Sequence, residues 1–325
     1  MIDDLSRELS TLGHQVLVAT SSVGADLLDL PYEVVVVDRN DPTEALSRVR
    51  EFVPDVIHVH NYLDNSTVLL NTLNLQARVI LTFHNEHKSL SDGPARARFE
   101  WVKQNVDGIV AVSDFVKRSV CESGDFGSVP VTRIWNGSHP RSGETEIGSG
   151  VLFMGRIVSE KGLGSLLAAM VLLIQKHEDV KLNVVGEGEM RALFEKLAND
   201  LGLAENVTFL GWQTGSKLEE LIHASRVIVV PSAWREPLGL VAIEGMMNSR
   251  PVIVTDRGGL PEIIEDKIQG FVVQPGDVIE LAVRLSQLVS NKPLAEEMGR
   301  AGYARAMSHF NLSHTARSYL EIYQG

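Results

Sequence analysis

The sequence predicts an α/β protein of two doubly wound domains, each built on a parallel sheet covered by helices. Short apolar runs alternate with amphipathic helical segments along the whole chain, which is the pattern of a parallel sheet. The alternation is interrupted at residues 140–150 by a polar, Gly/Ser-rich stretch that is typical of a linker. The length of 325 residues fits two domains of ordinary size.

The first half begins with an amphipathic helix over residues 2–12, whose apolar residues recur at helical spacing and which Gly13 ends. Apolar runs then predict strands, and the segments between them predict helices. The expected strands are 15–20, 32–37, 56–60, 78–84, 108–112 and 131–135, and the expected helices are 42–52, 66–75, 94–105 and 114–122.

The second half repeats this alternation. The expected strands are 151–155, 181–186, 207–210, 227–230, 252–255 and 270–273, and the expected helices are 163–176, 190–201, 215–224, 239–248, 277–289, 294–308 and 313–323. We place one domain at residues 1–146 and the other at 147–308, followed by a terminal helix within 309–325. The carboxyl ends of the strands in each sheet are expected to border a ligand-binding crevice.

Composition excludes several classes of protein. The longest apolar run, residues 166–174, is too short to span a bilayer. No basic segment followed by an apolar one opens the sequence, so we expect a cytoplasmic protein. The single cysteine, Cys121, rules out an internal disulfide. A net charge of −12 gives no basic excess for nucleic acid and disfavours adsorption to anionic membranes.

The segment 227–264 carries the densest set of groups suited to a ligand. Glu236 lies in the loop that follows a buried strand, and Glu244 lies in the second turn of the next helix, so its side chain leans back toward that loop. The backbone N–H groups of Gly239 and Leu240 are open donors at the helix start, which suits a phosphate. The alternative is that both glutamates merely complement the helix dipole.

This segment resembles the donor-binding segment of family 4 retaining glycosyltransferases, the group 1 enzymes that include glycogen synthases and phosphatidylinositol mannosyltransferases. The resemblance rests on Glu236 and Glu244 with seven residues between them, on Gly239, and on the Gly-Gly-Leu-Pro-Glu run at 258–262. It implies the GT-B fold, two Rossmann-like domains facing across a cleft, with the terminal helix crossing back to the first. It also implies that Glu236 contacts the donor sugar and that Glu244 binds the ribose hydroxyls.

Two cations follow the first strand of the second domain. Gly155 and Arg156 end that strand, and Lys161 comes shortly after, so both cations lie where a diphosphate leaving group needs positive charge. Ordinary surface cations are the alternative. The resembled family has the same Gly-Arg and Lys-Gly pattern, which implies that Arg156 and Lys161 contact the pyrophosphate as catalytic residues.

Further glycines end the next strands. Gly186 and Gly188 form a weak dinucleotide fingerprint, because Arg191 occupies the third glycine position. In the resembled family this motif allows a close approach of the backbone to the nucleotide. The resemblance also implies that the backbone around Gly211 contacts the donor base. We expect Trp212 to pack rather than to stack on that base.

Histidines gather at the strand ends of the first domain. His84 completes a Thr-Phe-His motif that in the resembled family sits beside the donor sugar, and a hydrogen-bonded structural role is the alternative. His58 and His60 share one face of a strand, but no spacing supplies a convincing third metal ligand. The resemblance implies a metal-independent enzyme without a cofactor, and places Asn136, like His60, on the acceptor side of the cleft.

The helix expected at 94–105 is basic and amphipathic. Such a helix can dock on a membrane that carries a lipid acceptor. The plainer interpretation is that it packs on its own sheet, so membrane association stays a secondary hypothesis.

These observations predict a hexosyltransferase of carbohydrate biosynthesis that moves a sugar from a nucleotide-diphosphate sugar to a hydroxyl of a glycan, a lipid-linked acceptor or a small molecule. Arg156, Lys161 and the amides of Gly239 and Leu240 would stabilise the departing diphosphate, and the acceptor would attack from the same face. One alternative is a non-hydrolysing sugar-nucleotide epimerase, which would need acid and base carboxylates in the first domain. Another is a non-catalytic protein that binds nucleotide-sugars.

The first domain departs from the family pattern. There, a strand and a Gly-Gly loop precede the helix that ends Leu-x-x-x-Gly-His, and that ending matches Leu9 to His14 here. Because Met1 already lies within the helix, we expect the first strand to be missing. That strand is central in the doubly wound order, so we expect a gap or forced pairing between strands 15–20 and 56–60. The first domain would then be unstable and poorly active, while the second would still bind nucleotide.

Overall fold

The structure is a computed structural model. It describes residues 1–21, 30–38, 40–61, 71–73, 76–86, 100–124, 126–139 and 146–325. The chain divides into two compact units, one formed by Met1–Gly137 together with Leu312–Gly325, and the other by Ser138–Asn311. The last helix is therefore part of the first unit, although the second unit separates it from that unit in sequence.

The first unit contains the strands and helices that its apolar pattern predicts. Its helices are α1 (Ile2–Thr11), α2 (Thr43–Phe52), α5 (Asp114–Ser123) and α12 (Leu312–Gln324), and its strands are β1 (Leu17–Thr20), β2 (Glu33–Val36), β3 (Val56–His60), β4 (Arg78–Phe83), β5 (Gly108–Ala111) and β6 (Val131–Arg133). Residues 71–73 and 100–105 are also helical. The remainder of the helices expected at 66–75 and 94–105 lies outside the described residues.

The strands of the first unit form two separate parallel sheets. One has the order β3-β4-β5-β6, and the other is the pair β1-β2. Within the described ranges no strand joins β1 to β3, so of the two expected arrangements, a gap or a forced pairing, these strands show no direct pairing. In the larger sheet, His58 lies opposite Ile80 and His60 opposite Thr82.

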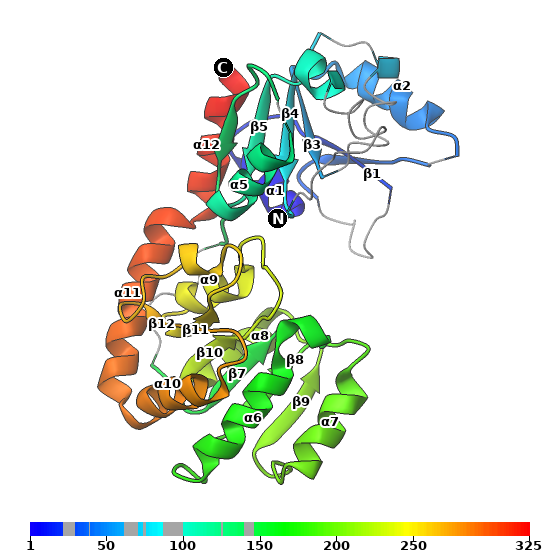
Figure 1. Ribbon diagram of the computed structural model, residues 1–325. Coiled ribbons are helices and arrows are strands. Elements are labelled where there is room, and N and C mark those ends of the chain that lie inside the picture. Colours follow the sequence, from blue (N-terminus) through cyan, green and yellow to red (C-terminus); the bar gives the residue numbers. More distant parts are fainter. Residues whose placement is uncertain are drawn as a thin grey trace. The chain divides into compact units, whose positions relative to one another are not determined.

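Alternate residues of the larger sheet face different helices. Leu81 and Phe83 belong to the hydrophobic cluster that includes α5. Ile80 and Val110 belong to a second cluster with side chains of α1 and α12, among them Tyr319. Because successive strand residues point to opposite faces, α12 and α5 cover opposite sides of this sheet (Figure 1).

The second unit also follows its predicted alternation. Its strands are β7 (Val151–Met154), β8 (Leu182–Val185), β9 (Val207–Gly211), β10 (Val227–Val230), β11 (Val252–Thr255) and β12 (Gly270–Val273), and its helices are α6 (Leu163–Ile174), α7 (Arg191–Asp200), α8 (Gly215–Ala224), α9 (Leu240–Met247), α10 (Val278–Ser290) and α11 (Lys292–His309), with short 3₁₀ turns at Ser159–Lys161 and Leu260–Glu262.

The six strands of this unit form one parallel sheet in the order β12-β11-β10-β7-β8-β9. The chain runs outward from β7 to β9, and then returns to the other side of β7 and runs outward from β10 to β12. The strand order therefore reverses between β7 and β10. In open parallel sheets, ligands bind beyond the carboxyl ends of the strands at this reversal, so the loops after β7 and β10 are placed to form a site.

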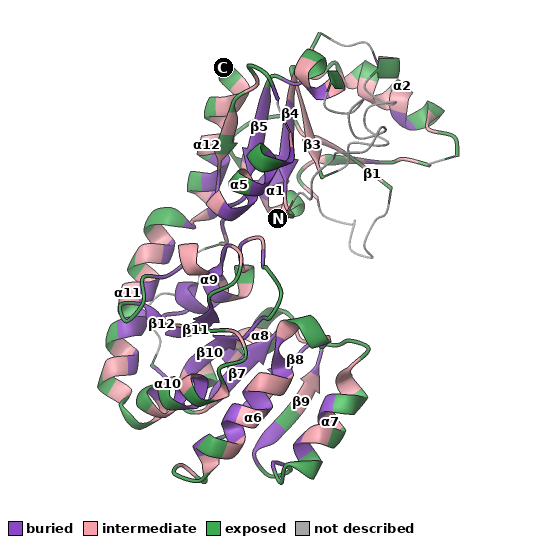
Figure 2. Ribbon diagram, viewed as in Figure 1, coloured by how far each residue is buried: buried purple, intermediate pink, exposed green. Residues whose placement is uncertain are grey.

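The middle of this sheet is its hydrophobic core. Every residue of β7, β10 and β11 is buried (Figure 2). Val229 and Ile253 contact the cluster that contains side chains of α6 and α10. Ile228 and Val252 face the other way, because a Cβ added to Gly245 of α9 would meet their side chains. Strands covered on both faces are apolar throughout, which explains the continuous apolar runs in the sequence.

The loops after β7 and β10 approach each other closely at Gly162. This residue has a left-handed backbone, with φ of 72°, and an added Cβ would lie 1.9 Å from the carbonyl oxygen of Pro231. Glycine is needed here both for the backbone conformation and for the contact. The close approach holds the 3₁₀ turn after β7 against the end of β10.

We expect Gly162→Ala to destabilise the second unit more than Gly202→Ala. Gly202 has nearly the same φ, 74°, but nothing lies within 4 Å of its added Cβ. Gly202→Ala carries only the cost of left-handed backbone, on the order of 1 kcal/mol. The clash at Gly162 should add roughly 1–3 kcal/mol. Urea unfolding of both variants measures the difference, and equal losses would show that the Pro231 carbonyl moves aside freely.

Candidate functional site

A partly buried ion pair links the loops that follow β7 and β10. Lys161 Nζ donates a hydrogen bond to Glu236 Oε1 at 2.5 Å. The side chains of Lys161 and Glu236 are only 23% and 10% exposed. A cation and a carboxylate that lie 75 residues apart in sequence are thus brought together at the reversal of strand order.

A buried hydroxyl network orients Glu236. Ser232 Oγ donates to the same Oε1 at 2.6 Å, and Thr255 Oγ1 donates to the Ser232 carbonyl at 2.6 Å. Lys161 and Ser232 both bond to Oε1. The other carboxylate oxygen, Oε2, forms no hydrogen bond with any residue that the structure describes. Sequence reasoning missed Ser232 and Thr255, although both stand at strand ends near the predicted glutamate.

The Gly-Gly-Leu-Pro-Glu run holds the backbone of Glu236. The N–H of Gly259 donates to the Glu236 carbonyl at 2.7 Å. Gly258 has a φ of 61°, and an added Cβ there would lie 2.1 Å from the same carbonyl oxygen. The glycines of this run therefore serve the close approach of two loops, which fixes the position of the carboxylate.

Helix α9 begins with open amides. Gly239 caps the helix with a left-handed backbone of φ 108°, and a Cβ added there would lie 2.4 Å from the side chain of Leu260. Across the described ranges, the N–H groups of Gly239 and Leu240 have no protein acceptor. Glu244 lies on the second turn and is half-buried. The helix start thus offers donors to an anion close to the Glu236 loop.

Arg156 differs from Lys161 in its surroundings. It directly follows Gly155 at the carboxyl end of β7, and it is exposed. No residue that the structure describes forms an ion pair or hydrogen bond with its guanidinium. Of the two predicted cations, Lys161 already has a carboxylate partner, whereas Arg156 is open to an anionic ligand.

The glycines after β8 allow neighbouring loops to touch. A Cβ added to Gly186 would lie 1.9 Å from the Gly155 carbonyl oxygen, and one added to Gly188 would lie 2.2 Å from the Ile157 carbonyl oxygen. The N–H of Gly186 also donates to the carbonyl of Gly211 at 2.8 Å. These glycines let the loops after β7, β8 and β9 pack side by side.

The prediction that Trp212 packs is wrong. Its side chain is 69% exposed. It follows Gly211, which has a φ of 71° and ends β9 at the edge of the sheet. The turn at this glycine directs the chain away from the core, and the sequence pattern gave no sign of it.

In the first unit, His58 lies in a network with α12. His58 and His60 share a face of β3, as predicted, and their ring centroids are 3.9 Å apart. His58 Nδ1 lies 2.7 Å from the hydroxyl of Tyr323, and Nε2 lies 2.7 Å from Thr82 Oγ1. Both ring nitrogens of His58 are therefore engaged within the protein.

His84 lies beside His60. His84 Nε2 is 2.8 Å from His60 Nδ1, and the two rings are stacked with an angle of 27° between their planes. The fold thus brings His84 to His58 and His60 as the third imidazole of one cluster, which their spacing in the sequence did not predict. Even so, among the residues that the structure describes, no group of three His, Cys, Asp or Glu side chains is arranged to hold a metal ion.

Burial keeps these imidazoles neutral. Loss of solvent lowers the pKa of His58 to about 3 and that of His84 to about 4, and it holds the pKa of His60 well below its usual range. A neutral imidazole has one N–H donor and one bare acceptor nitrogen. The cluster therefore offers neutral hydrogen-bonding groups and no positive charge near neutral pH.

Asn136 is buried after β6, and its Oδ1 has no hydrogen-bond partner in the described part of the chain. It makes no hydrogen bond to His60 or His84. The structure thus brings the two histidines together and leaves Asn136 with an unused acceptor, which is unusual for a buried polar group.

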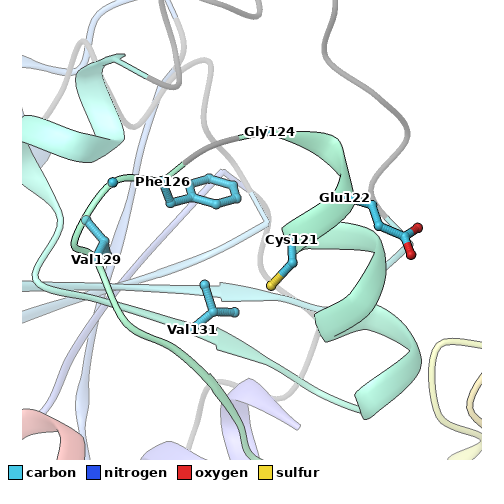
Figure 3. Close-up of a pocket in the computed structure, with 7 residues that line it drawn as sticks. Cys121, Glu122, Gly124, Phe126, Val129 and Val131 are labelled. Atoms are coloured by element: carbon cyan, nitrogen blue, oxygen red, sulfur yellow. The ribbon is translucent and has the colours of Figure 1, made fainter.

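A shallow pocket lies elsewhere in the first unit. Figure 3 shows the sulfur of Cys121 facing Phe126 and Val131, at the end of α5. None of the predicted site residues lines this pocket. The membrane-docking hypothesis concerned the helix at 94–105, the first half of which lies outside the described residues. Among the helices that are described, none is long and apolar enough to cross a membrane.

Two units of parallel sheet and helices, one with a charged site at its reversal of strand order, define a class of Rossmann-like α/β proteins. Residues 139–305 match the family model of the glycosyl transferases group 1, and residues 1–140 match the model described as glycosyltransferase family 4. The first match covers more than half of the chain. The protein therefore belongs to the group 1 glycosyl transferases.

Individual relatives agree with this assignment. The chain is 29% identical over 233 residues to the uncharacterized glycosyltransferase MJ1607 of Methanocaldococcus jannaschii, covering 66% of this chain and 59% of that protein. It is 27% identical over 308 residues to the phosphatidyl-myo-inositol mannosyltransferase of Mycobacterium leprae, covering 91% and 81%. The crystal structure of Anabaena Alr3699/HepE in complex with UDP-glucose superposes with a TM-score of 0.80 at 20% identity, covering 98% and 94%. The expected GT-B fold is thus confirmed.

We expect the first unit to lose stability as pH falls from about 6.5 toward about 4. An unfolded histidine titrates near 6.5, whereas His84 in the folded protein titrates near 4. In this window the unfolded chain binds more protons, so the free energy of unfolding rises with pH, by at most about 1.4 kcal/mol per pH unit for each such histidine.

His84→Asn should make this dependence shallower, and His14→Asn, at an exposed histidine outside the cluster, is the matched control. Urea unfolding of the three proteins between about pH 5 and about pH 7 measures the slopes. A slope unaltered by His84→Asn would show that this imidazole is solvated when folded.

Proposed function

We propose that this protein is a retaining glycosyltransferase that moves a sugar from a nucleotide-diphosphate sugar to a hydroxyl acceptor, without a metal ion or other cofactor. The observation that carries the proposal is the Lys161–Glu236 pair, set beside the open amides of α9 in a group 1 glycosyl transferase. A structural neighbour, Alr3699/HepE, was solved with UDP-glucose, which supports a nucleotide-sugar as the donor class.

The second unit binds the donor. The diphosphate accepts hydrogen bonds from the N–H groups of Gly239 and Leu240 and pairs with Arg156. Because Lys161 already shares its charge with Glu236, the exposed Arg156 supplies most of the uncompensated positive charge. Glu244 accepts hydrogen bonds from the ribose hydroxyls, and its half-buried position on α9 suits that role.

Glu236 holds the donor sugar and does not attack it. Its Oε1 is occupied by Lys161 and Ser232, so the remaining oxygen is available to accept a hydrogen bond from a sugar hydroxyl. A carboxylate neutralised by a lysine at 2.5 Å is a poor nucleophile. This disfavours a covalent two-step scheme of the kind used by retaining glycosidases.

Transfer then proceeds in one step on one face of the sugar. The bond between the anomeric carbon and the diphosphate oxygen breaks, and its electron pair remains on the diphosphate. The acceptor oxygen bonds to the anomeric carbon from the side of the leaving group, and its proton passes to the departing diphosphate. Arg156, Lys161 and the helix amides stabilise the charge that develops there.

The first unit offers neutral groups that suit uncharged hydroxyls. His84 is neutral at the end of β4 and offers a ring nitrogen to a sugar hydroxyl. Asn136, with its unused buried Oδ1, accepts from the acceptor side. An epimerase would instead need acid and base carboxylates in place of these neutral groups, so we do not favour that activity.

Incubation with a panel of nucleotide-sugars and hydroxyl acceptors tests the proposal. Proton NMR should show a product with the anomeric configuration of the donor, and EDTA should leave the rate unchanged. Inversion, or strict dependence on a divalent metal, would place the chemistry outside this scheme. Binding of the nucleotide-sugar without any transfer would favour a non-catalytic protein.

Arg156→Ala and Lys161→Ala should each reduce turnover at least about a hundredfold, the scale for losing one charge partner of the transition state. Arg300→Ala removes an exposed arginine of the same unit and serves as the matched control. Thermal unfolding of Lys161→Ala shows whether loss of the bond to Glu236 also destabilises the fold. Near-normal turnover in both site variants would contradict the leaving-group role.

A further inference from the structure

The hydrogen bond between His60 and His84 constrains both rings. When both imidazoles are neutral, a contact of 2.8 Å between His60 Nδ1 and His84 Nε2 requires one nitrogen to donate and the other to accept. The proton on one ring then decides where the proton of the other ring lies. The pair has only two arrangements, and each of them fixes both tautomers.

We propose that His60 is a positioning residue, whose Nδ1 accepts the Nε2 proton of His84 so that His84 presents a bare Nδ1 to a sugar hydroxyl. The inference deepens the proposed function, since it rests on His84 as a sugar contact. It assigns His60 a role that acts through His84, beyond a general place on the acceptor side.

The backbone holds the two rings in register. His60 lies opposite Thr82 on the neighbouring parallel strand. Asn61, with a left-handed backbone of φ 61°, donates its N–H to the Thr82 carbonyl at 2.9 Å and accepts the N–H of His84 on its side chain at 2.7 Å. Through Asn61, the ends of β3 and β4 are thus bonded together directly beside the imidazole pair.

The chemistry of imidazole selects one of the two arrangements. Neutral histidine intrinsically prefers to carry its proton on Nε2. If His84 donates from Nε2 to His60 Nδ1, both rings keep this preferred form, whereas the reverse bond forces both into the less stable one. His58 does not compete for the pair, because Tyr323 and Thr82 engage both of its nitrogens.

The ring nitrogens outside this hydrogen bond are His84 Nδ1 and His60 Nε2, and together they offer one acceptor and one donor. Neither His84 Nδ1 nor His60 Nε2 bonds to any residue that the structure describes, and neither is among its buried unpartnered atoms. In the selected arrangement, His84 Nδ1 accepts and His60 Nε2 donates. A sugar hydroxyl both donates and accepts, so it suits this pair, whereas a phosphate would need donors or cations.

Nitrogen NMR of protein labelled with ¹⁵N-histidine tests the arrangement directly, without substrate. We expect a protonated shift at His84 Nε2 and a bare-nitrogen shift at His84 Nδ1. His60→Leu should abolish this pattern and give a mixture of tautomers. His60→Asn should retain it, because the side-chain oxygen of asparagine lies close to the position of Nδ1 and accepts the same proton.

Kinetics supply the second measurement. His60→Leu should lower kcat/KM for the sugar substrate by roughly tenfold, the scale for one hydrogen bond, and His60→Asn should recover a large part of that loss. A proton on His84 Nδ1 in the native protein would overturn the proposal. So would a folded His60→Asn protein with the His84 tautomer preserved but with activity as low as His60→Leu. The NMR result stands even if no transferase activity is found, so the two proposals fail separately.

Discussion

The partly buried contact between Lys161 and Glu236 is the interaction on which the second unit's site depends. An isolated charge in this environment would be costly, and removal of one partner from such a pair leaves the other uncompensated. The loops after β7 and β10, which carry the pair, meet closely at Gly162, where a side chain would collide with Pro231. The strand order and the left-handed backbone of Gly162 therefore both bear on the position of the ion pair.

The same contact orients the carboxylate. Lys161 and Ser232 bond to one oxygen of Glu236, and Gly258 and Gly259 hold its backbone from the other side. Sequence motifs that look like separate short patterns thus converge on a single side chain. Preorganised groups of this kind need not reorganise when charge develops in a reaction, which suits a site for a diphosphate.

The polar groups at the strand ends of the first unit are neutral, unlike the charged groups of the second unit. Its strand ends carry neutral imidazoles, bonded to one another and to hydroxyls of Thr82 and Tyr323. Tyr323 comes from α12, so the last helix of the chain completes a network that begins on β3. Neutral donors and acceptors are suited to hydroxyl groups, whereas the charged groups of the second unit are suited to phosphate.

The sequence by itself determined most of the strands and helices, because their apolar periodicity is a local property of the chain. It also indicated the segments that carry Lys161 and Glu236, and it left open a gap or a forced pairing between β1 and β3. Only the tertiary structure decided that Lys161 bonds to Glu236, that His84 lies against His60, that Ser232 and Thr255 support the site, and that Trp212 is exposed. These contacts join residues far apart in sequence, and they depend on strand order and backbone turns, which periodicity along the chain does not encode.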